Sequence, residues 1–214
     1  MLRVTLLDNC GVPITGEDSA QSATDGFVSV EFDPQYQEGQ EYQQRKANGG
    51  RCVDERGFSY LRWVNLTVQL CTLDTDVVNL ITGQQPIMTG DEFTGTVFSD
   101  RLLDSRFSLE LWQPVGGDAV CDPDGQQQWV YWAFPNLSDA RLQSGTFEND
   151  VFNISFQAST AAASPLWFVG DDYLADTPAL EWEIGSHYGF NVTTVEPPLD
   201  TGCGAQPLEP VSLG

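Results

Sequence analysis

The stretch that decides the expected fold is FSYLRWVNLTVQLCTLDTDVVNLITG, residues 58–83. Its first half alternates with a period of two, which is the side-chain period of a β-strand. One side carries Tyr60, Arg62, Val64, Leu66, Val68 and Leu70, and the other carries Leu61, Trp63, Asn65, Thr67, Gln69 and Cys71. The pattern predicts one long strand with a mainly apolar side and a mainly polar side.

The second half of this stretch changes period and predicts a helix of about two turns. Residues 74–76 (DTD) offer an N-cap oxygen and carboxylates for the positive end of the helix. Val77, Leu80 and Ile81 make a short apolar stripe, and Gly83 is placed to end the helix.

The rest of the chain is expected to consist mostly of strands joined by turns. Strands are expected at 27–32, 93–99, 106–114, 128–135, 147–159 and 188–195. Asp33-Pro34 is expected to end the first of them. Residues 11–26 and 37–57 are interpreted as loops, 84–92 as a turn region and the tail 197–214 as irregular. About eight strands and one helix predict a single β-sandwich or barrel domain over residues 1–214.

The charge excludes an ordinary nucleic-acid binder. The chain has 31 acidic and 9 basic residues, a net charge of −22, whereas binding driven by counterion release needs a basic surface. The sequence has no run of 18 apolar residues, so no membrane span is predicted. The N-terminus lacks a signal-peptide pattern. We therefore expect a chain that stays inside the cell, whose 5 cysteines are mostly thiols.

The basic residues are unevenly placed. Five of the 9 lie between positions 45 and 62, and they are Arg45, Lys46, Arg51, Arg56 and Arg62. Residues 107–214 hold 15 acids and one base, Arg141. A basic island on an acidic protein indicates an element that docks on another copy, and the alternative is a solvated loop.

No candidate catalytic, cofactor or metal site survives inspection. His187 is the single histidine, which disfavours a histidine-based triad or metal cluster. Asp122-Pro123-Asp124-Gly125 is better explained as a turn than as a calcium loop, because further ligands are missing. Glu181 and Glu183 flank Trp182, as carboxylates do in glycosidase clefts, but such pairs arise by chance in so acidic a chain. We expect no enzyme activity.

Polar strand faces are the more informative feature. Uncharged side chains at Thr94, Thr96, Asn153, Ser155 and Gln157 could line a wet channel, or simply form the solvent side of a sandwich. Residues 128–135, with Trp129 and Trp132, are apolar on both sides. They are expected to be buried on both sides or to lie at an interface.

Taken in order, several segments of this chain resemble the major tail protein of long-tailed phages of actinobacteria, the tail-tube subunit. The matching pieces are Cys10-Gly11-Val12-Pro13, GFVSVEF at 26–32, Gly-Gly-Arg-Cys at 49–52, the strand ending in Leu70-Cys71, Ile81-Thr82-Gly83, Leu109-Glu110-Leu111-Trp112, Cys121, Tyr131 with Pro135, TFEND at 146–150, Trp167 through Tyr173, and HYGFNVTTVEPP at 187–198. The likeness covers most of the chain.

The resemblance implies two packed antiparallel sheets with a flanking helix, in hexameric rings whose strands join into a β-barrel around a lumen. Rings stack on a tape-measure protein and meet terminator and baseplate proteins. DNA later passes through an acidic lumen that does not retain it. The protein would be part of the virion, assembled in the host cytoplasm. Interface candidates are then Arg45, Lys46, Arg51, Arg56, Arg62, Trp129 and Trp132, and lumen candidates are Thr94, Thr96, Asn153, Ser155 and Gln157.

Two other functions remain open from the sequence. One is a secreted carbohydrate-binding or hydrolytic β-sandwich, which the carboxylates, tryptophans and Asn-x-Ser/Thr sites would fit. The other is a virion protein of the same fold, such as a terminator or baseplate hub. In the tube hypothesis, the loop around 45–57 is expected to be disordered in the free subunit and to order on assembly.

Overall fold

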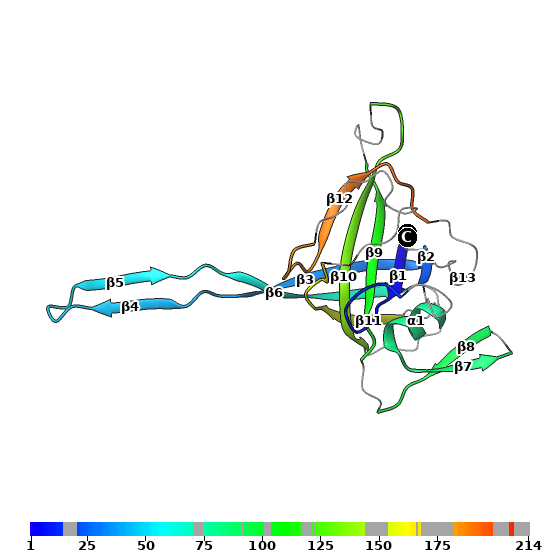
Figure 1. Ribbon diagram of the computed structural model, residues 1–214, viewed down its shortest axis with the longest axis horizontal. Coiled ribbons are helices and arrows are strands. Elements are labelled where there is room, and N and C mark those ends of the chain that lie inside the picture. The colour runs from blue at the N-terminus through cyan, green and yellow to red at the C-terminus, as the bar shows by residue number, and fades with distance from the viewer. Residues whose placement is uncertain are drawn as a thin grey trace.

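The computed structural model describes residues 1–14, 21–70, 75–90, 92–100, 104–116, 121, 123–143, 154–165, 167, 182–198 and 206–207. Its elements are β1 (Leu2–Leu6), β2 (Gln21–Thr24), β3 (Phe27–Gln37), β4 (Glu41–Arg45), β5 (Arg51–Arg56), β6 (Tyr60–Leu70), α1 (Thr75–Thr82), β7 (Gln85–Thr89), β8 (Glu92–Val97), β9 (Phe107–Pro114), β10 (Trp129–Leu142), β11 (Ile154–Thr160), β12 (Gly189–Thr193) and β13 (Gln206–Pro207). Within these residues the fold is mainly β with one short helix (Figure 1).

One continuous antiparallel sheet makes both layers of a β-sandwich. Its strand order is β13-β2-β1-β9-β10-β11-β6-β3, and β12 also pairs with β10. The first part of β10 pairs with β9, and its last part, from Leu137, pairs with β11. Register shifts between Phe134 and Leu137 and between Ser138 and Arg141 mark bulges, which bend a strand sharply. The sheet therefore folds over itself at β10, and the described part of one chain forms no closed barrel.

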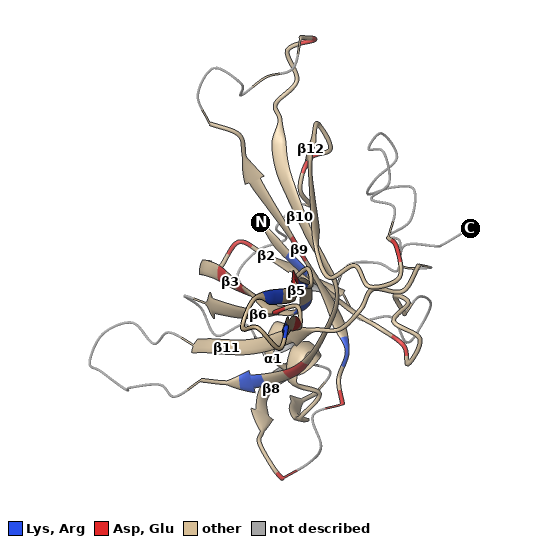
Figure 2. Cartoon of the chain, turned by 90° about the vertical axis from the view of Figure 1, so that its left-hand side faces the viewer, with Lys and Arg blue, Asp and Glu red and all other residues tan. Residues whose placement is uncertain are grey.

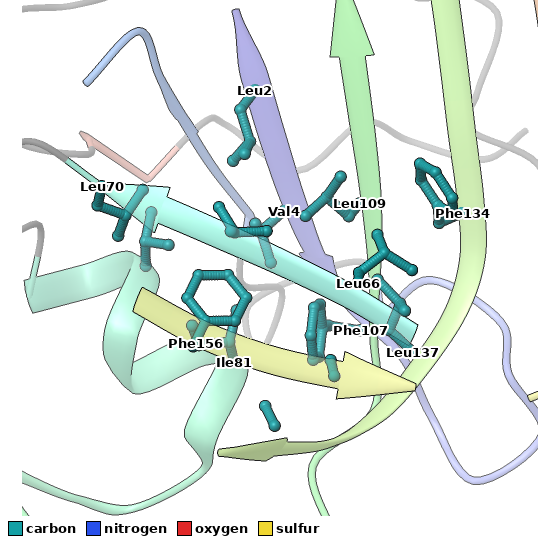
Figure 3. Packing of buried hydrophobic residues seen from close by; sticks show 14 of the residues in the cluster. Leu2, Val4, Leu66, Leu70, Ile81, Phe107, Leu109, Phe134, Leu137 and Phe156 are labelled. Atoms are coloured by element: carbon teal, nitrogen blue, oxygen red, sulfur yellow. The ribbon is translucent and has the colours of Figure 1, made fainter. Parts of the chain in front are cut away.

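The core lies between these two layers (Figure 3). β6 turns its even-numbered residues Val64–Leu70 inward, and all four are at most 1% exposed. They meet Leu2 and Val4 from β1, Phe107 and Leu109 from β9, and Phe134 and Leu137 from β10. The long alternating strand predicted from residues 60–70 is confirmed.

Helix α1 covers the open end of this core. Val77 and Ile81 are fully buried in the cluster, and Leu80 packs against it. Gly83 ends the helix with φ +58, and its N–H donates to the carbonyl of Asn79 at 2.9 Å. The predicted apolar stripe and the glycine stop are confirmed, and Asp74 lies outside the described residues.

Strand β3 runs past the point where the sequence predicted its end. Pro34 is paired with Val64 in the middle of β3, so the prediction that Asp33-Pro34 ends the strand is wrong. Among the described residues β3 is an edge strand. Proline is tolerated at such an edge because its missing N–H can face away from the neighbouring strand.

Three segments predicted as loops or turns also contain strands. Residues 21–24 form β2, residues 85–89 form β7, and the segment 37–57 forms most of a hairpin. In Figure 1 this hairpin, β4–β5, extends far from the sandwich as a long arm. Nearly all residues of the two strands are polar or exposed, because neither strand packs against the sandwich. The segment therefore lacks the apolar alternation by which strands are recognised in a sequence.

The arm leaves the sandwich through a neck that admits only glycine at one position. A Cβ built on Gly39 would lie 2.0 Å from the carbonyl oxygen of Gly57. The N–H of Gly57 donates to the carbonyl of Gln40 at 2.9 Å. The two backbones are therefore in direct contact where the β3–β6 ladder gives way to the β4–β5 ladder.

Strand β10 is covered on both sides by the chain itself. On the side away from the main core, Trp112, Tyr131, Ala133 and Trp167 form a second cluster, and Trp129 packs against it. Trp132 packs against the main core. Residues 128–135 were expected either to be buried on both sides or to lie at an interface. Tyr131, Ala133 and Phe134 are buried within the chain, whereas Trp129 and Trp132 stay partly exposed.

His187 connects the segment 182–198 to the sandwich. Its Nδ1 lies 2.8 Å from the Thr160 hydroxyl, which accepts the N–H of Val64 at 2.8 Å. The Thr160 hydroxyl and His187 Nδ1 share one hydrogen bond, and the tautomer of the neutral ring decides which of the two donates. Burial lowers the pKa of His187 below its ordinary value of 6.5.

Acidification is expected to destabilise the protein through His187. The folded state favours the neutral ring, so this contribution is complete above the ordinary pKa of 6.5 and is lost as pH falls through the lowered folded pKa. His187→Asn keeps an acceptor and does not titrate, so it should lose less stability than wild type between pH 7.5 and pH 5.5. Urea unfolding at both pH values measures the difference, and identical losses in both proteins would contradict the assignment.

Candidate assembly surfaces

The outer face of one layer is a continuous polar surface of four strands. β3, β6 and β11 follow one another in this layer, as Figure 2 shows in a view down the arm. The end of β10 completes the layer. The pairing aligns three rows across it: Ser29–Gln69–Ser155, Glu31–Thr67–Gln157–Arg141 and Asp33–Asn65–Ser159–Ser138. Most of these side chains are uncharged hydrogen-bonding groups. We call this surface the polar face.

The two long edges of the polar face are unpaired. β3 pairs only with β6, and Ser138–Leu142 of β10 pairs only with β11, among the described residues. Open edges present free backbone N–H and C=O groups and are sites where other strands add. In a long-lived protein such edges are usually covered or paired.

The structure brings together some of the predicted lumen residues and separates others. Ser155 and Gln157 lie on the polar face. Thr94 and Thr96 lie on β8, part of a separate hairpin with β7. Thr96 donates a hydrogen bond to Asn79 of α1, and Asn153 lies outside the described residues.

Sequence reasoning missed most of the polar face, although the signal was partly visible. The alternation of residues 60–70 already placed Asn65, Thr67 and Gln69 on one side. It could not show that Glu31, Asp33 and Arg141 share that side, because cross-strand rows depend on register.

The arm carries most of the predicted basic island at its exposed surface. Arg45 ends β4, Lys46 begins the turn, and Arg51 and Arg56 lie at the two ends of β5. Arg51 pairs with Asp54, and Arg56 lies 3.6 Å from Glu41. Such exposed pairs contribute little to stability, so the charges remain available for another surface. Arg62 lies at the base of the arm, stacked on Trp63 with 4.5 Å to the ring centre.

An apolar groove opens between the two layers near β12. Its volume is about 490 Å³, and its lining includes Phe27, Val30, Phe32, Leu111, Trp132 and Phe134. Trp132 contacts Phe32 with ring centres 5.5 Å apart and Phe190 at 4.9 Å. Of these rings, Phe190 is 60% exposed. The predicted interface residue Trp132 therefore lies at the mouth of this groove.

The described part of the chain contains no candidate metal site. No group of three or more His, Cys, Asp or Glu side chains there is arranged to hold a metal ion. Cys10, Cys52 and Cys121 are exposed and unpaired, whereas Cys71, Cys203, Asp122 and Glu181 lie outside the described residues. No helix in that part is long and apolar enough to cross a membrane.

Comparison with known proteins gave two kinds of result. No protein-family model matches the chain, and no curated protein matches it. One similar solved chain comes from the PVC sheath–tube complex of an extracellular contractile injection system in the extended state, with 15% identity over 74% of this chain and 82% of that chain and a TM-score of 0.31. Another comes from the anti-feeding prophage cap, a tube terminating cap, with 12% identity, the same coverage and a TM-score of 0.31. At these scores neither likeness assigns a function to this chain.

Proposed function

We propose that the protein is the structural subunit of a phage tail tube, in which hexameric rings stack around a tape-measure protein and later conduct DNA. One observation carries the proposal: a four-stranded layer with a polar outer face and two unpaired edges. The residue-level resemblance to major tail proteins supports it independently. The role is structural, without catalytic or cofactor chemistry, and the protein would belong to the virion.

The layer has the geometry needed to close on copies of itself. Its four strands are antiparallel, so β3 and the end of β10 run in opposite directions. When copies share one orientation around a ring axis, β3 of one copy therefore meets β10 of the next as an antiparallel neighbour. A ring closed in this way leaves no open edge and turns the polar face toward the lumen.

The two projecting hairpins supply contacts outside such a barrel. The arm bears Arg45, Lys46, Arg51 and Arg56, and a neighbouring copy of this acidic protein offers carboxylates. The β7–β8 hairpin exposes Ile87, Met88 and Val97. We assign the arm to contacts between stacked rings, and we expect terminator and baseplate proteins to meet the tube ends.

Electron microscopy of the purified protein tests the proposal directly. Negative-stain images over a range of protein and salt concentrations should show rings and hollow tubes. Monomer alone under all conditions would contradict the assignment. Single rings that never stack would favour a terminator or baseplate role, and a monomer that binds sugars would favour the carbohydrate-binding alternative.

Assembly is expected to protect the arm from trypsin. Cut sites follow Arg45, Lys46, Arg51 and Arg56, and nearly every residue of β4 and β5 is exposed. A two-stranded hairpin alone is marginally stable in water, so the free subunit should be cut there quickly. Tubes should resist, because the arm then lies against a neighbour. Mass spectrometry of timed digests measures both rates, and equal cleavage in subunit and tube would remove the arm from the assembly contacts.

The assembled tube is expected not to retain DNA. The polar face offers uncharged groups, the carboxylates of Glu31 and Asp33, and one base, Arg141, which already contacts the Asp139 carboxylate. Such a surface has too little positive charge to bind DNA through counterion release. Thr67→Lys places a cation in the middle of that face, so its tubes should retain a short duplex at low salt and release it as salt rises. Gln127→Lys, exposed before β10, is the matched control. Co-sedimentation measures retention, and equal behaviour of both variants would mean that Thr67 does not face the lumen.

A further inference from the structure

Opposite charges lie at the two opposite edges of the polar face. Arg141 and Glu31 are the first and last members of one row, Arg141–Gln157–Thr67–Glu31. Asp33 follows two residues later on the same side of β3, about 7 Å along the strand. Between these edges the rows contain only uncharged polar side chains. The distance across the layer prevents contact within one chain, so the two edges are complementary to a second copy.

Arg141 is placed to bind a carboxylate beyond its own chain. It is the single Lys or Arg among residues 107–214. Its side chain is 65% exposed and contacts Asp139 at 2.6 and 2.9 Å, and Asp139 adopts the uncommon φ of +57. The pair holds the guanidinium at the edge but is exposed and therefore weak. Because a guanidinium carries five N–H donors, it can bind a second carboxylate without losing the first.

The acidic edge has no such base of its own. Glu31 and Asp33 are exposed, and no Lys or Arg of the described polar face lies beside them. Two copies of a chain with net charge −22 repel each other on approach. A joint between β3 and β10 therefore needs local attraction, and the base closest to the open β10 edge supplies it.

We propose that Arg141 of one copy binds the Glu31 and Asp33 carboxylates of the next copy, as an ion-pair clamp on the lumen side of each ring joint. This inference rests on the proposed function. In this proposal β3 of one copy lies beside β10 of the next, so the carboxylates of β3 and the guanidinium of Arg141 bind each other across the joint. If the rows of two copies align, Arg141 lies opposite Glu31, and a shift of two residues in one direction places it opposite Asp33.

Charge reversal on one side of the joint is expected to block assembly. Arg141→Glu should raise the critical concentration for tube formation about tenfold or more, because like charges then meet at every joint. The double variant Glu31→Arg/Asp33→Arg should fail for the same reason. Arg106→Glu makes the same charge change at an exposed site outside the rows and should assemble as wild type does.

Restoration distinguishes the clamp from a general loss of structure. A 1:1 mixture of the two failing variants can alternate around a ring with opposite charges at every joint, so the mixture should form tubes. The chain carrying all three substitutions should also assemble. Light scattering and negative-stain images measure yield, and thermal melting checks that each subunit is folded.

Two outcomes would overturn the clamp while leaving the tube proposal intact. One is Arg141→Glu assembling at the wild-type concentration. The other is folded variants that assemble neither when mixed nor when combined in one chain. Failure of the proposed function is a separate result, since wild-type protein itself would then form neither rings nor tubes.

Discussion

Replacing Glu110 by alanine is expected to lower the free energy of unfolding by about 3–5 kcal/mol. Arg3 and Glu110 are paired across β1 and β9, and both side chains are fully buried. The carboxylate accepts from Nε and Nη2 of Arg3 at 2.6 and 2.5 Å and from the hydroxyl of Tyr131 at 2.7 Å. The variant leaves a buried guanidinium without its counter-charge, which is the costly case for ion pairs.

Tyr131 belongs to the same buried network, so a variant designed to restore stability must replace it as well. Burial, and next the Glu110 carboxylate, raise the pKa of Tyr131 well above its ordinary value of 10.0, so its hydroxyl stays protonated and donates. Replacing Glu110 alone also leaves that buried hydroxyl without its hydrogen-bond acceptor. Substituting all three polar groups, as Arg3→Met, Glu110→Leu and Tyr131→Phe, should recover most of the loss, because apolar replacements of a whole buried network are often neutral or stabilising.

Urea unfolding at pH 7 measures these changes. Arg56→Ala serves as the surface control, since it removes an exposed pair with Glu41 at 3.6 Å and should cost about 0–1 kcal/mol. A loss below about 1 kcal/mol for Glu110→Ala would mean that the site relaxes or admits water. Arg3 and Glu110 would then not behave as a buried ion pair.

Removing the arm is expected to abolish stacked tubes without destabilising the subunit. The N–H of Gly57 donates to the carbonyl of Gln40, so the two backbone segments at the base of the arm are close enough to be joined by a short turn. Residues 41–56 can be replaced by Asn-Gly, the pair that favours two-residue hairpin turns. No residue of β4 or β5 belongs to either buried cluster, so the melting temperature should hardly change.

The measurement is tube length in negative-stain images together with sedimentation. Rings are still expected, because the open edges of β3 and β10 are untouched by the deletion. Gly50→Ala, a small change in the turn that meets only the Asn48 side chain, is the matched control and should stack normally. Tubes of wild-type length from the armless protein would contradict the assignment of the arm to ring stacking.

Local physics explains what could be predicted of the fold. The alternation of residues 60–70 and the stripe at Val77 and Ile81 are periodic features of one element, and each determined which side faces the core. A glycine with φ +58 ended the helix as expected. These choices depend on neighbours in sequence, so they were visible before any pairing was known.

Elements without an apolar period escaped prediction. β4 and β5 pair with each other through their backbones while their side chains face solvent, and β3 continues through Pro34 because its outer edge is free. The segment 128–135 was apolar on both sides, which left burial and interface equally open. Packing against two clusters decided in favour of burial for its central residues.

The sequence by itself determined a mainly β sandwich with one helix, the polar side of its long strand, and the uneven charge. Only the tertiary structure decided that one bent strand, β10, joins both layers and that Glu31 and Arg141 end the same row. The physical reason is that strand periodicity is local, whereas register and bulges arise from pairing between distant segments, such as Glu31 with Thr67 and Thr67 with Gln157. A shift of one residue in that pairing would move every side chain to the other face.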